Sequence, residues 1–293
     1  MTFRLIGLAV ALTASALLPA PAAGQPGNEP AAPFRIADNL YFVGSSDIGS
    51  YLITTPAGHI LIDAGYDSTV PIIEANIAAF GFKVQDVKIL LNTQAHYDHA
   101  GGFAVMKKRT GAALMVSSAD ADVIERGGTR DFSLGDKYPF PAVTVDRRLQ
   151  DGDAVPLGGT TLTAHLTPGH TMGCTTWTFD TRDRGRTLHV VDLCGLSILE
   201  NTRVSGMPGY PGIAQDYERT FVALKKLPVD IFIGAHAGYY GGREKAARAQ
   251  ADPSGPNPFV DPEGFRKMID GAEQRFREQL ARGKASRGQG AGG

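Results

Sequence analysis

Residues 94–99 read Gln-Ala-His-Tyr-Asp-His, and they follow an apolar stretch, residues 87–92, that is typical of a buried β-strand. A turn at the end of that strand can direct His96, Asp98 and His99 into one cleft. Placing these residues in a packed core instead would bury an unpaired charge, which is energetically costly. Two imidazoles and a carboxylate are ligands that suit zinc. The segment therefore predicts a chain that folds around a metal site at the end of a strand.

Two more histidines follow predicted strands in turns that contain glycine. His170 lies in Thr-Pro-Gly-His-Thr at 167–171, and His236 lies in Gly-Ala-His-Ala-Gly at 234–238. Glycine and proline fix tight turns and let the backbone approach a bound ion closely. We interpret both residues as further ligands. The histidines that lie in or next to strands are interpreted as ordinary structural residues; they are His59, His165 and His189.

The rest of the chain shows strand and helix patterns throughout. Strands are predicted at 40–43, 51–54, 59–63, 87–92, 113–116, 160–166, 175–179, 188–193 and 229–233, and helices at 69–80, 103–110, 118–126, 214–227 and from 261 onward. Strands precede helices in both halves, which favours sheets in the middle with helices outside. Irregular segments are predicted at 25–33 (a loose lead-in), 127–148 (a long loop of the kind that often covers a site) and 283–293 (a flexible tail).

The first 24 residues have the order of a secretory signal peptide. Arg4 is the only charge, an apolar run covers residues 5–18, and small residues mixed with prolines follow up to Gly24. The run is too short for a comfortable membrane span, and an uncleaved anchor is the alternative interpretation. We expect cleavage near Gly24 and export of the chain to the periplasm. Since the sequence has no second long apolar run, no integral membrane domain is expected.

Charge and cysteine content exclude several classes of function. A formal net charge of −1 argues against a nucleic-acid partner, because phosphate binding needs a surplus of Lys and Arg. Two cysteines exclude a disulfide-dense scaffold and any four-cysteine metal site. Cys174 and Cys194 flank a predicted hairpin whose symmetric pairing would bring them close together. An exported chain could form a disulfide there, and two buried thiols are the alternative.

Together these segments resemble the metallo-β-lactamase superfamily. The similar stretches are Leu-Ile-Asp-Ala-Gly at 61–65, the metal loop at 94–102, the turn at 167–171 and Ala235-His236. Residues 34–282 can be laid along the third subclass of these β-lactamases. The resemblance implies an α/β fold, a four-layer αββα sandwich of two similar halves, as a single domain over residues 25–293. It places the metal cleft at one edge of the two sheets.

The resemblance also implies a ligand set for one or two zinc ions. The first site would be Gln94, His96 and His170, and the second would be Asp98, His99 and His236. Most of the family has histidine where this chain has Gln94, and a carboxamide oxygen is a weaker zinc donor than an imidazole. We therefore expect the second site to be the tighter one. Cys194 lies one residue away from a ligand position of other subclasses and is not assigned as a ligand.

Three further residues receive roles from the same resemblance. Asp98 would orient the attacking water and pass on its proton, with ligation alone as the alternative. Asp63 would steady a histidine or the metal loop, or it would only cap a turn at the end of a strand. Ser197 matches a position that binds the substrate carboxylate in the third subclass, and Gly195 stands at the first such position.

The implied function is zinc-dependent hydrolysis of the β-lactam amide bond of penicillins, cephalosporins and carbapenems, which confers antibiotic resistance. We expect a monomer that acts on a small molecule. Another hydrolase on the same metal loop is the alternative: a thioester hydrolase, a lactonase or a phosphodiesterase. A non-catalytic binding protein, with Gln94 as the mark of a decayed site, is a third class. The signal peptide argues against a cytosolic thioester hydrolase, and the retained second-site residues argue against decay.

Overall fold

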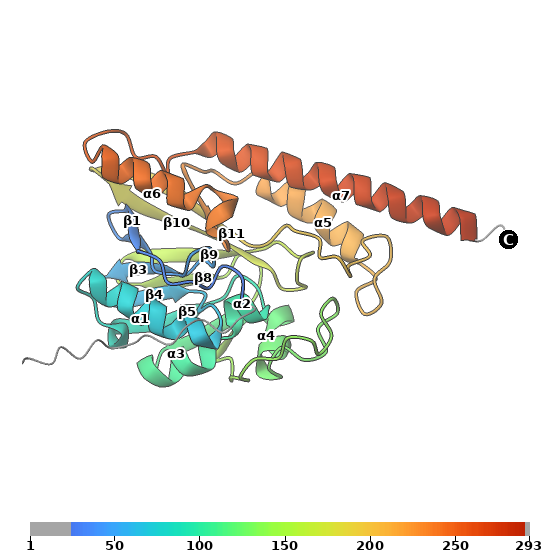
Figure 1. Ribbon diagram of the computed structural model, residues 1–293, viewed down its shortest axis with the longest axis horizontal. Helices are drawn as coiled ribbons and strands as arrows, with labels where there is room; N and C mark the ends of the chain where they lie inside the picture. Colours follow the sequence, from blue (N-terminus) through green and yellow to red (C-terminus); the bar gives the residue numbers. More distant parts are fainter. Residues whose placement is uncertain (1–24, 291–293) are drawn as a thin grey trace, which may run out of the picture.

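A computed structural model of the chain describes residues 25–290, with the side chains of residues 25–285. The predicted signal peptide, residues 1–24, lies outside the described residues, and so does the end of the predicted tail at 291–293. The described chain places two β-sheets between two sets of helices (Figure 1).

The two sheets differ in size and pairing. The first has seven strands in the order β1-β2-β3-β4-β5-β6-β7, with bounds Phe34–Ala37, Leu40–Phe42, Tyr51–Thr55, Gly58–Ile62, Val87–Leu91, Ala113–Ser117 and Arg147–Leu149. The second has five strands in the order β12-β11-β10-β9-β8, with bounds Ile231–Gly234, Arg186–Leu193, Thr175–Asp183, Thr160–Leu166 and Ala154–Leu157. In the first sheet, β1 to β4 pair antiparallel and β4 to β7 pair parallel.

Helices cover the outer side of each sheet (Figure 1). On the side of the first sheet lie α1 (Val70–Ala79), α2 (Tyr97–Ala100), α3 (Phe103–Thr110) and α4 (Ser118–Glu125). On the side of the second lie α5 (Ile213–Leu224), α6 (Gly242–Ala251) and α7 (Pro262–Gly290). Single 3₁₀ turns occur at Asp67–Thr69, Val84–Asp86 and Ala237–Tyr239. The sequence of layers confirms the predicted four-layer α/β sandwich.

Strand β4, in the middle of the first sheet, is buried on both faces because its side chains alternate between two cores. In β4, Ile60 and Ile62 join the core between the sheets, together with Trp177 of β10. Leu61 points the other way, into a second core that includes Ile73 of α1. A strand with two buried faces has a continuous apolar sequence, which is how this strand is recognised.

The N-terminal segment is more ordered than the predicted loose lead-in at 25–33. Asn28 is only 1% exposed. The carbonyl oxygen of Gly27 accepts hydrogen bonds from Asp47 N and Ser45 Oγ. Pro- and Gly-rich composition predicts a loose segment, but hydrogen bonds to distant parts of the chain hold it in place, so this prediction is wrong.

One helix is longer than predicted, and several elements are additional to the predicted ones. Helix α7 continues to Gly290, past residue 283 where we predict a flexible tail. Helix α6 has the sequence Gly-Arg-Glu-Lys-Ala-Ala-Arg-Ala-Gln-Ala. This sequence has no stripe of large apolar residues from which a helix could be predicted. Strands β1, β7 and β8 have four residues or fewer, too few for a periodic pattern to be seen.

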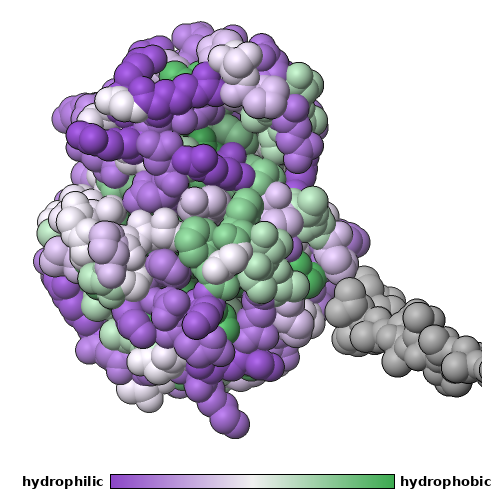
Figure 2. Space-filling view, turned by 90° about the vertical axis from the view of Figure 1, so that its left-hand side faces the viewer, coloured by the Kyte–Doolittle hydropathy of each residue, from purple (hydrophilic) through white to green (hydrophobic). Residues whose placement is uncertain are grey.

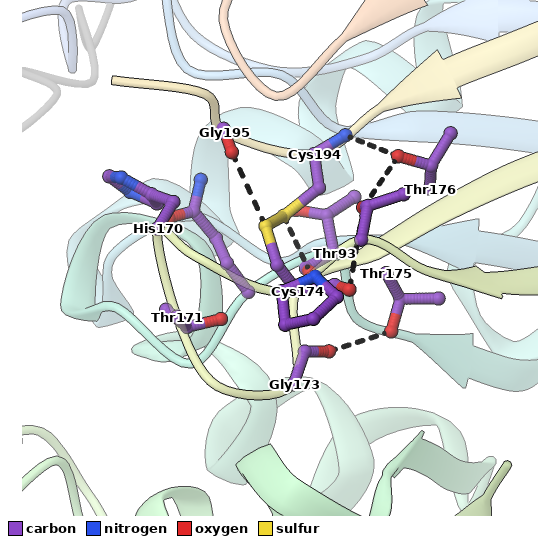
Figure 3. Close-up of a disulfide and its surroundings, with 12 residues drawn as sticks. Thr93, His170, Thr171, Gly173, Cys174, Thr175, Thr176, Cys194 and Gly195 are labelled. Atoms are coloured by element: carbon purple, nitrogen blue, oxygen red, sulfur yellow. Dashed lines mark hydrogen bonds between the residues drawn. A yellow bond between two sulfur atoms is a disulfide. The ribbon is translucent and has the colours of Figure 1, made fainter. Parts of the chain in front are cut away.

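Cys174 and Cys194 form a disulfide, with their Cα atoms 5.9 Å apart. Cys174 directly precedes β10 and Cys194 directly follows β11, as the predicted hairpin requires. Of the two alternatives that the sequence leaves open, a disulfide and two buried thiols, the structure has the disulfide. Figure 3 shows it between the turn that carries His170 and the chain at Gly195.

The described surface is mostly polar. Met172 and Val222 are the only large hydrophobic side chains that stand exposed among the described residues. Figure 2 shows one face of the molecule, on which hydrophilic side chains predominate and apolar ones gather near the middle. Within the described part of the chain, no helix is long and apolar enough to cross a membrane.

Candidate metal centre

The predicted ligands lie on turns that follow the ends of strands. Gln94 and His96 follow β5, and α2 begins immediately after His96. His170 follows β9, and His236 follows β12. Since β5 belongs to the first sheet and the other two strands belong to the second, both halves of the sandwich contribute. The short distances between these side chains place all the turns at one edge of the sheets.

Asp98, His99 and His236 form a group of possible metal ligands. One ligand atom from each residue lies within 4.8 Å of the other two. Asp98 Oδ2 is 3.4 Å from His99 Nε2 and 3.8 Å from His236 Nε2. Two imidazole nitrogens and a carboxylate oxygen thus surround one small space, which is a donor set that suits zinc.

Each imidazole of this group has a carboxylate at its other ring nitrogen. His99 Nδ1 lies 3.3 Å from Asp63 Oδ2, and His236 Nδ1 lies 2.9 Å from Asp47 Oδ2. A carboxylate at Nδ1 favours the tautomer that keeps a proton there and leaves the lone pair of Nε2 free for a metal. The two histidines are therefore oriented toward the space beside Asp98.

Asp63 also ties the metal loop to the end of β4. Its carboxylate accepts hydrogen bonds from Thr93 N at 2.8 Å, from Thr93 Oγ1 and from Asn92 Nδ2 at 3.1 Å. The backbone φ of Asp63 is +55°, an uncommon value for a residue other than glycine. Such a conformation persists where surrounding contacts enforce it. The geometry places Asp63 beside both His99 and the loop.

Sequence reasoning missed Asp47. It lies between β2 and β3, and its partner His236 is 189 residues away along the chain. The hydrogen bond from His236 is the main reason why the pKa of Asp47 lies below its usual value. No local motif marks Asp47, because only the folded chain brings it to the site.

Gln94, His96 and His170 form a second group beside the first. His96 Nδ1 is 3.1 Å from His170 Nε2, and all three side chains are buried. Neither polar atom of the Gln94 side chain has a hydrogen-bond partner within the described chain. A buried amide without partners is costly, so this side chain is suited to contact a ligand that the protein itself does not supply.

The imidazoles of this second group have weaker orienting partners. His170 Nδ1 lies 2.7 Å from the carbonyl oxygen of Ser197, to which it can donate its proton. His96 Nε2 lies 3.9 Å from Asp131 Oδ2, which is beyond hydrogen-bond length. Asp131 belongs to the long loop predicted at 127–148, so this loop reaches the site.

The two groups differ in charge in the metal-free site. Burial, followed by the neighbouring His96, lowers the pKa of His170 to about 3. Burial opposes the charge of His99 as well, but Asp98 and Asp63 outweigh it and raise the pKa of His99 to about 10. Burial likewise opposes the charge of Asp98, but His99 holds the pKa of that carboxyl well below its usual value. An anionic carboxylate beside a protonated imidazole can exchange that proton for a metal cation.

Gly195 makes room for the ring of His170. A Cβ atom at this position would lie 2.6 Å from His170 Cδ2, too close for two non-bonded carbons. The disulfide lies next to Gly195 and to Thr93. Cys174 Sγ is 3.4 Å from Gly195 O, and Cys194 Sγ is 3.0 Å from Thr93 O (Figure 3). The bridge therefore packs against the start of the metal loop and against the chain that accommodates His170.

A buried carboxylate outside the predicted set connects two of the turns. Asp120, on α4, accepts hydrogen bonds from Ala95 N at 3.0 Å, Thr171 Oγ1 at 2.7 Å and Gly173 N at 2.8 Å. Ala95 belongs to the metal loop, and the other two donors belong to the turn of His170. Burial raises the pKa of Asp120 to about 6. In the sequence, Asp120 looks like any acidic residue in the first turn of a helix.

Ser197 lies at the site, and its backbone makes its closest contacts. Its carbonyl oxygen accepts from His170 Nδ1 and from Tyr217 OH at 3.0 Å, while its hydroxyl oxygen is 3.3 Å from His170 Nδ1. The residue is exposed, so its hydroxyl is accessible to a ligand. Contact with a substrate carboxylate stays a prediction for Ser197.

The residues present fit a metal ion. Among the described residues, buried side-chain atoms without a hydrogen-bond partner gather at this place, namely Gln94 Oε1, Gln94 Nε2 and His99 Nε2. Such atoms are rare in folded proteins and indicate a ligand or ion at the site. Their chemical types, imidazole nitrogen and amide oxygen next to the Asp98 carboxylate, are those that zinc accepts.

Comparison with known proteins bears on this geometry. The family model described as the metallo-beta-lactamase superfamily matches residues 47–236. Among curated proteins, a hydroxyacylglutathione hydrolase from Hyphomonas neptunium is 30% identical over 120 residues, which cover 40% of this chain and 40% of that protein. The matches cover about a third to a half of the length of the first curated relatives.

Solved structures match over nearly their whole length. The native FEZ-1 metallo-beta-lactamase from Legionella gormanii is 42% identical, with a TM-score of 0.85, and the match covers 88% of this chain and 99% of that one. LRA-12 from an Alaskan soil metagenome, described as a class B3 di-zinc metallo-beta-lactamase, is 38% identical, with a TM-score of 0.83 and 89% and 98% coverage.

Proposed function

Because this chain belongs to the metallo-β-lactamase superfamily, we propose that it is a zinc-dependent β-lactamase that opens the amide bond of penicillins, cephalosporins and carbapenems. The observation that carries the proposal is the group formed by Asp98, His99 and His236, whose ligand atoms lie within 4.8 Å of one another. The nearly full-length likeness to B3-type β-lactamases supports this substrate class.

We propose that Asp98, His99 and His236 hold the tighter zinc ion, and that Gln94, His96 and His170 hold a second, weaker one. A zinc ion supplies Lewis acidity, which polarises a carbonyl group and makes water acidic enough to serve as a nucleophile near neutral pH. One ion per chain is expected at low zinc concentration and two at saturation.

The protein's own side chains position the reactants. Asp98 is partly exposed and lies beside both histidines, so we expect its carboxylate to orient the attacking water and pass on its proton. Asp47 and Asp63 keep the two histidines of the tight site in one tautomer. The hydroxyl of Ser197 can donate a hydrogen bond to the carboxylate that β-lactams carry beside the reacting ring.

Thioester hydrolysis is the second candidate, favoured by the curated relatives, which include several hydroxyacylglutathione hydrolases. Their matches cover at most about half of the chain, whereas the FEZ-1 and LRA-12 structures match 88% and 89% of it. We therefore rank β-lactam hydrolysis first.

The deciding experiment is hydrolysis of a chromogenic cephalosporin by purified, zinc-loaded protein. Activity should vanish with a chelator, return with zinc, and fall strongly in the Asp98→Asn variant, whereas a conservative Asp122→Asn change on the surface of α4 should leave it unchanged. A protein that leaves penicillins, cephalosporins and carbapenems intact but cleaves S-lactoylglutathione would support the second candidate instead.

We also propose that residues 1–24 act as a signal peptide that is removed, so that residues 25–293 form one periplasmic domain. N-terminal sequencing of protein recovered from the periplasm of an expressing cell tests this directly. A mature chain that starts near residue 25 is expected, and a chain that keeps residue 1 and stays with the membrane would contradict it.

A further inference from the structure

The segment at 25–29 is tied to the chain between β2 and β3. The carbonyl oxygen of Gly27 accepts hydrogen bonds from Asp47 N at 3.0 Å and from Ser45 Oγ at 2.6 Å. The carbonyl oxygen of Glu29 accepts one from Ser46 N at 2.8 Å. Residues 25–29 thus supply the hydrogen-bond partners of three successive residues, Ser45 to Asp47.

The segment is itself anchored by Asn28, which is only 1% exposed. Its side-chain nitrogen donates hydrogen bonds to Gln25 Oε1 and to Ser68 Oγ, both at 2.9 Å. Its side-chain oxygen, Oδ1, accepts a hydrogen bond from Thr69 Oγ1. Ser68 and Thr69 lie in the first 3₁₀ turn, Asp67–Thr69. The segment therefore has a fixed position relative to the first half of the fold.

The chain that it holds carries the carboxylate that faces His236. Asp47 accepts hydrogen bonds from His236 Nδ1 at 2.9 Å and from Gly238 N at 2.8 Å, and its carbonyl oxygen accepts one from Ala237 N at 2.7 Å. Asp47 thereby fixes the imidazole of His236 and the two residues that follow it. Any shift of Asp47 is passed directly to His236.

The contact between Gly27 and Asp47 leaves no space for a side chain. A Cβ atom at Gly27 would lie 2.9 Å from Asp47 Cβ, and the φ of Gly27 is +75°, which favours glycine. Gly81, after α1, offers a matched comparison, since its φ is +81° and nothing lies within 4 Å of a Cβ atom placed there. The two glycines share a backbone conformation and differ in their surroundings.

We propose that residues 25–29 act as an N-terminal clip that positions Asp47 and, through it, the imidazole of His236. The inference rests on the metal site of the proposed function and adds a segment of the chain that lies outside the matched family region, residues 47–236. The clip keeps the proton of His236 on Nδ1, so that Nε2 faces Asp98 with its lone pair free. It makes the start of the described chain a part of the metal-site scaffold.

The second half of the fold holds the same stretch independently of the clip. Arg243, on α6, donates to Ser46 O at 3.1 Å and to Ser45 O. It also donates to Ala32 O at 2.6 Å. Loss of the clip should therefore displace Asp47 without unfolding the stretch, which makes the effect measurable in a folded protein.

The test compares Gly27→Ala with Gly81→Ala in the full-length mature protein. The first readout is zinc affinity, measured by competition with a chromophoric chelator. The second is the long-range ¹H–¹⁵N spectrum of the histidine rings in metal-free protein, which reports the tautomer of His236. Asn28→Ala, which removes the anchor of the clip without adding a side chain, serves as a second variant.

We expect Gly27→Ala and Asn28→Ala to weaken the tighter zinc site about tenfold or more and to give His236 a mixture of tautomers, while Gly81→Ala behaves like the parent. Parent-like affinity and tautomer in both clip variants would overturn the proposal, and so would an equal loss in Gly81→Ala. If the parent binds zinc but hydrolyses no β-lactam, the proposed function fails while this comparison still decides the role of the clip.

Discussion

Reduction of the Cys174–Cys194 disulfide is expected to remove a large share of the protein's stability. The bridge joins residues 20 apart in the sequence. Closing a loop of this length lowers the conformational entropy of the unfolded chain, which corresponds to about 3 kcal/mol at 25 °C. Both cysteines are fully buried, so reduction exposes no new surface in the folded state and the entropy of the unfolded chain should dominate. We therefore expect the free energy of unfolding to fall by about 3 kcal/mol.

Urea unfolding of the metal-free protein, followed by circular dichroism with and without a reductant, measures this loss. The matched control is the double variant Cys174→Ala and Cys194→Ala, which should unfold at lower urea than the oxidised parent and be insensitive to the reductant. Thiol titration of the denatured parent shows whether the bridge has been opened. An unchanged urea midpoint after the thiols have appeared would refute the reasoning, as would an equal effect of reductant on the double variant.

Three further results follow from the geometry. Changing Gln94→His should raise the zinc content of dialysed protein from about one toward two ions per chain, and full occupancy of both sites in the parent would contradict this. Changing Gly195→Ala should displace His170 and weaken zinc binding at the first site at least about tenfold. Gly212→Ala should leave zinc binding unchanged, because no atom lies closer than 4.0 Å to a Cβ placed there, and zinc titration of the two variants compares their affinities. For Asp120, burial raises the folded-state pKa from its ordinary value of 3.8 to about 6, so in metal-free protein its contribution to the free energy of unfolding should decline by roughly 3 kcal/mol as pH rises from about 4 to about 6. Urea unfolding of Asp120→Asn across this range should lack that decline, and equal slopes in both proteins would refute it.

The ligand turns can be predicted from the sequence because each has a local signature. An apolar strand with two buried faces is followed at once by a short polar motif or by a glycine-flanked histidine, as at Gln94 to His99 and at His236. Strands β9 and β12 run in the same direction in the second sheet and end at the same edge, so their turns lie near each other, and the packing of the two sheets brings the turn after β5 to them. Helix α3 is predicted to the residue for a similar reason: its C-terminal Gly111 has φ +68° and ends it locally.

The residues that orient the ligands could not be predicted in the same way. Asp47 and Asp120 are ordinary acidic residues in sequence, and their partners lie 189 and up to 53 residues away. The N-terminal clip is a further segment whose contacts could not be predicted. Its Pro- and Gly-rich composition indicates a loose segment, but its backbone carbonyl oxygens accept hydrogen bonds from residues far along the chain. Hydrogen bonds over such separations depend on the tertiary fold, for which a single sequence has no local pattern.

The two proposed sites differ in more than the substitution at Gln94. In the tight site, both imidazoles face a carboxylate: His99 faces Asp63 at 3.3 Å, and His236 faces Asp47 at 2.9 Å. In the weak site, His170 Nδ1 lies 2.7 Å from a neutral carbonyl oxygen, and the carboxylate nearest to His96 is 3.9 Å away. Carboxylate partners raise the basicity of an imidazole ligand more than a neutral carbonyl does. A histidine at position 94 would thus supply a better donor but leave the orienting partners unchanged, so the site built on Asp98 should remain the first to fill even in that variant.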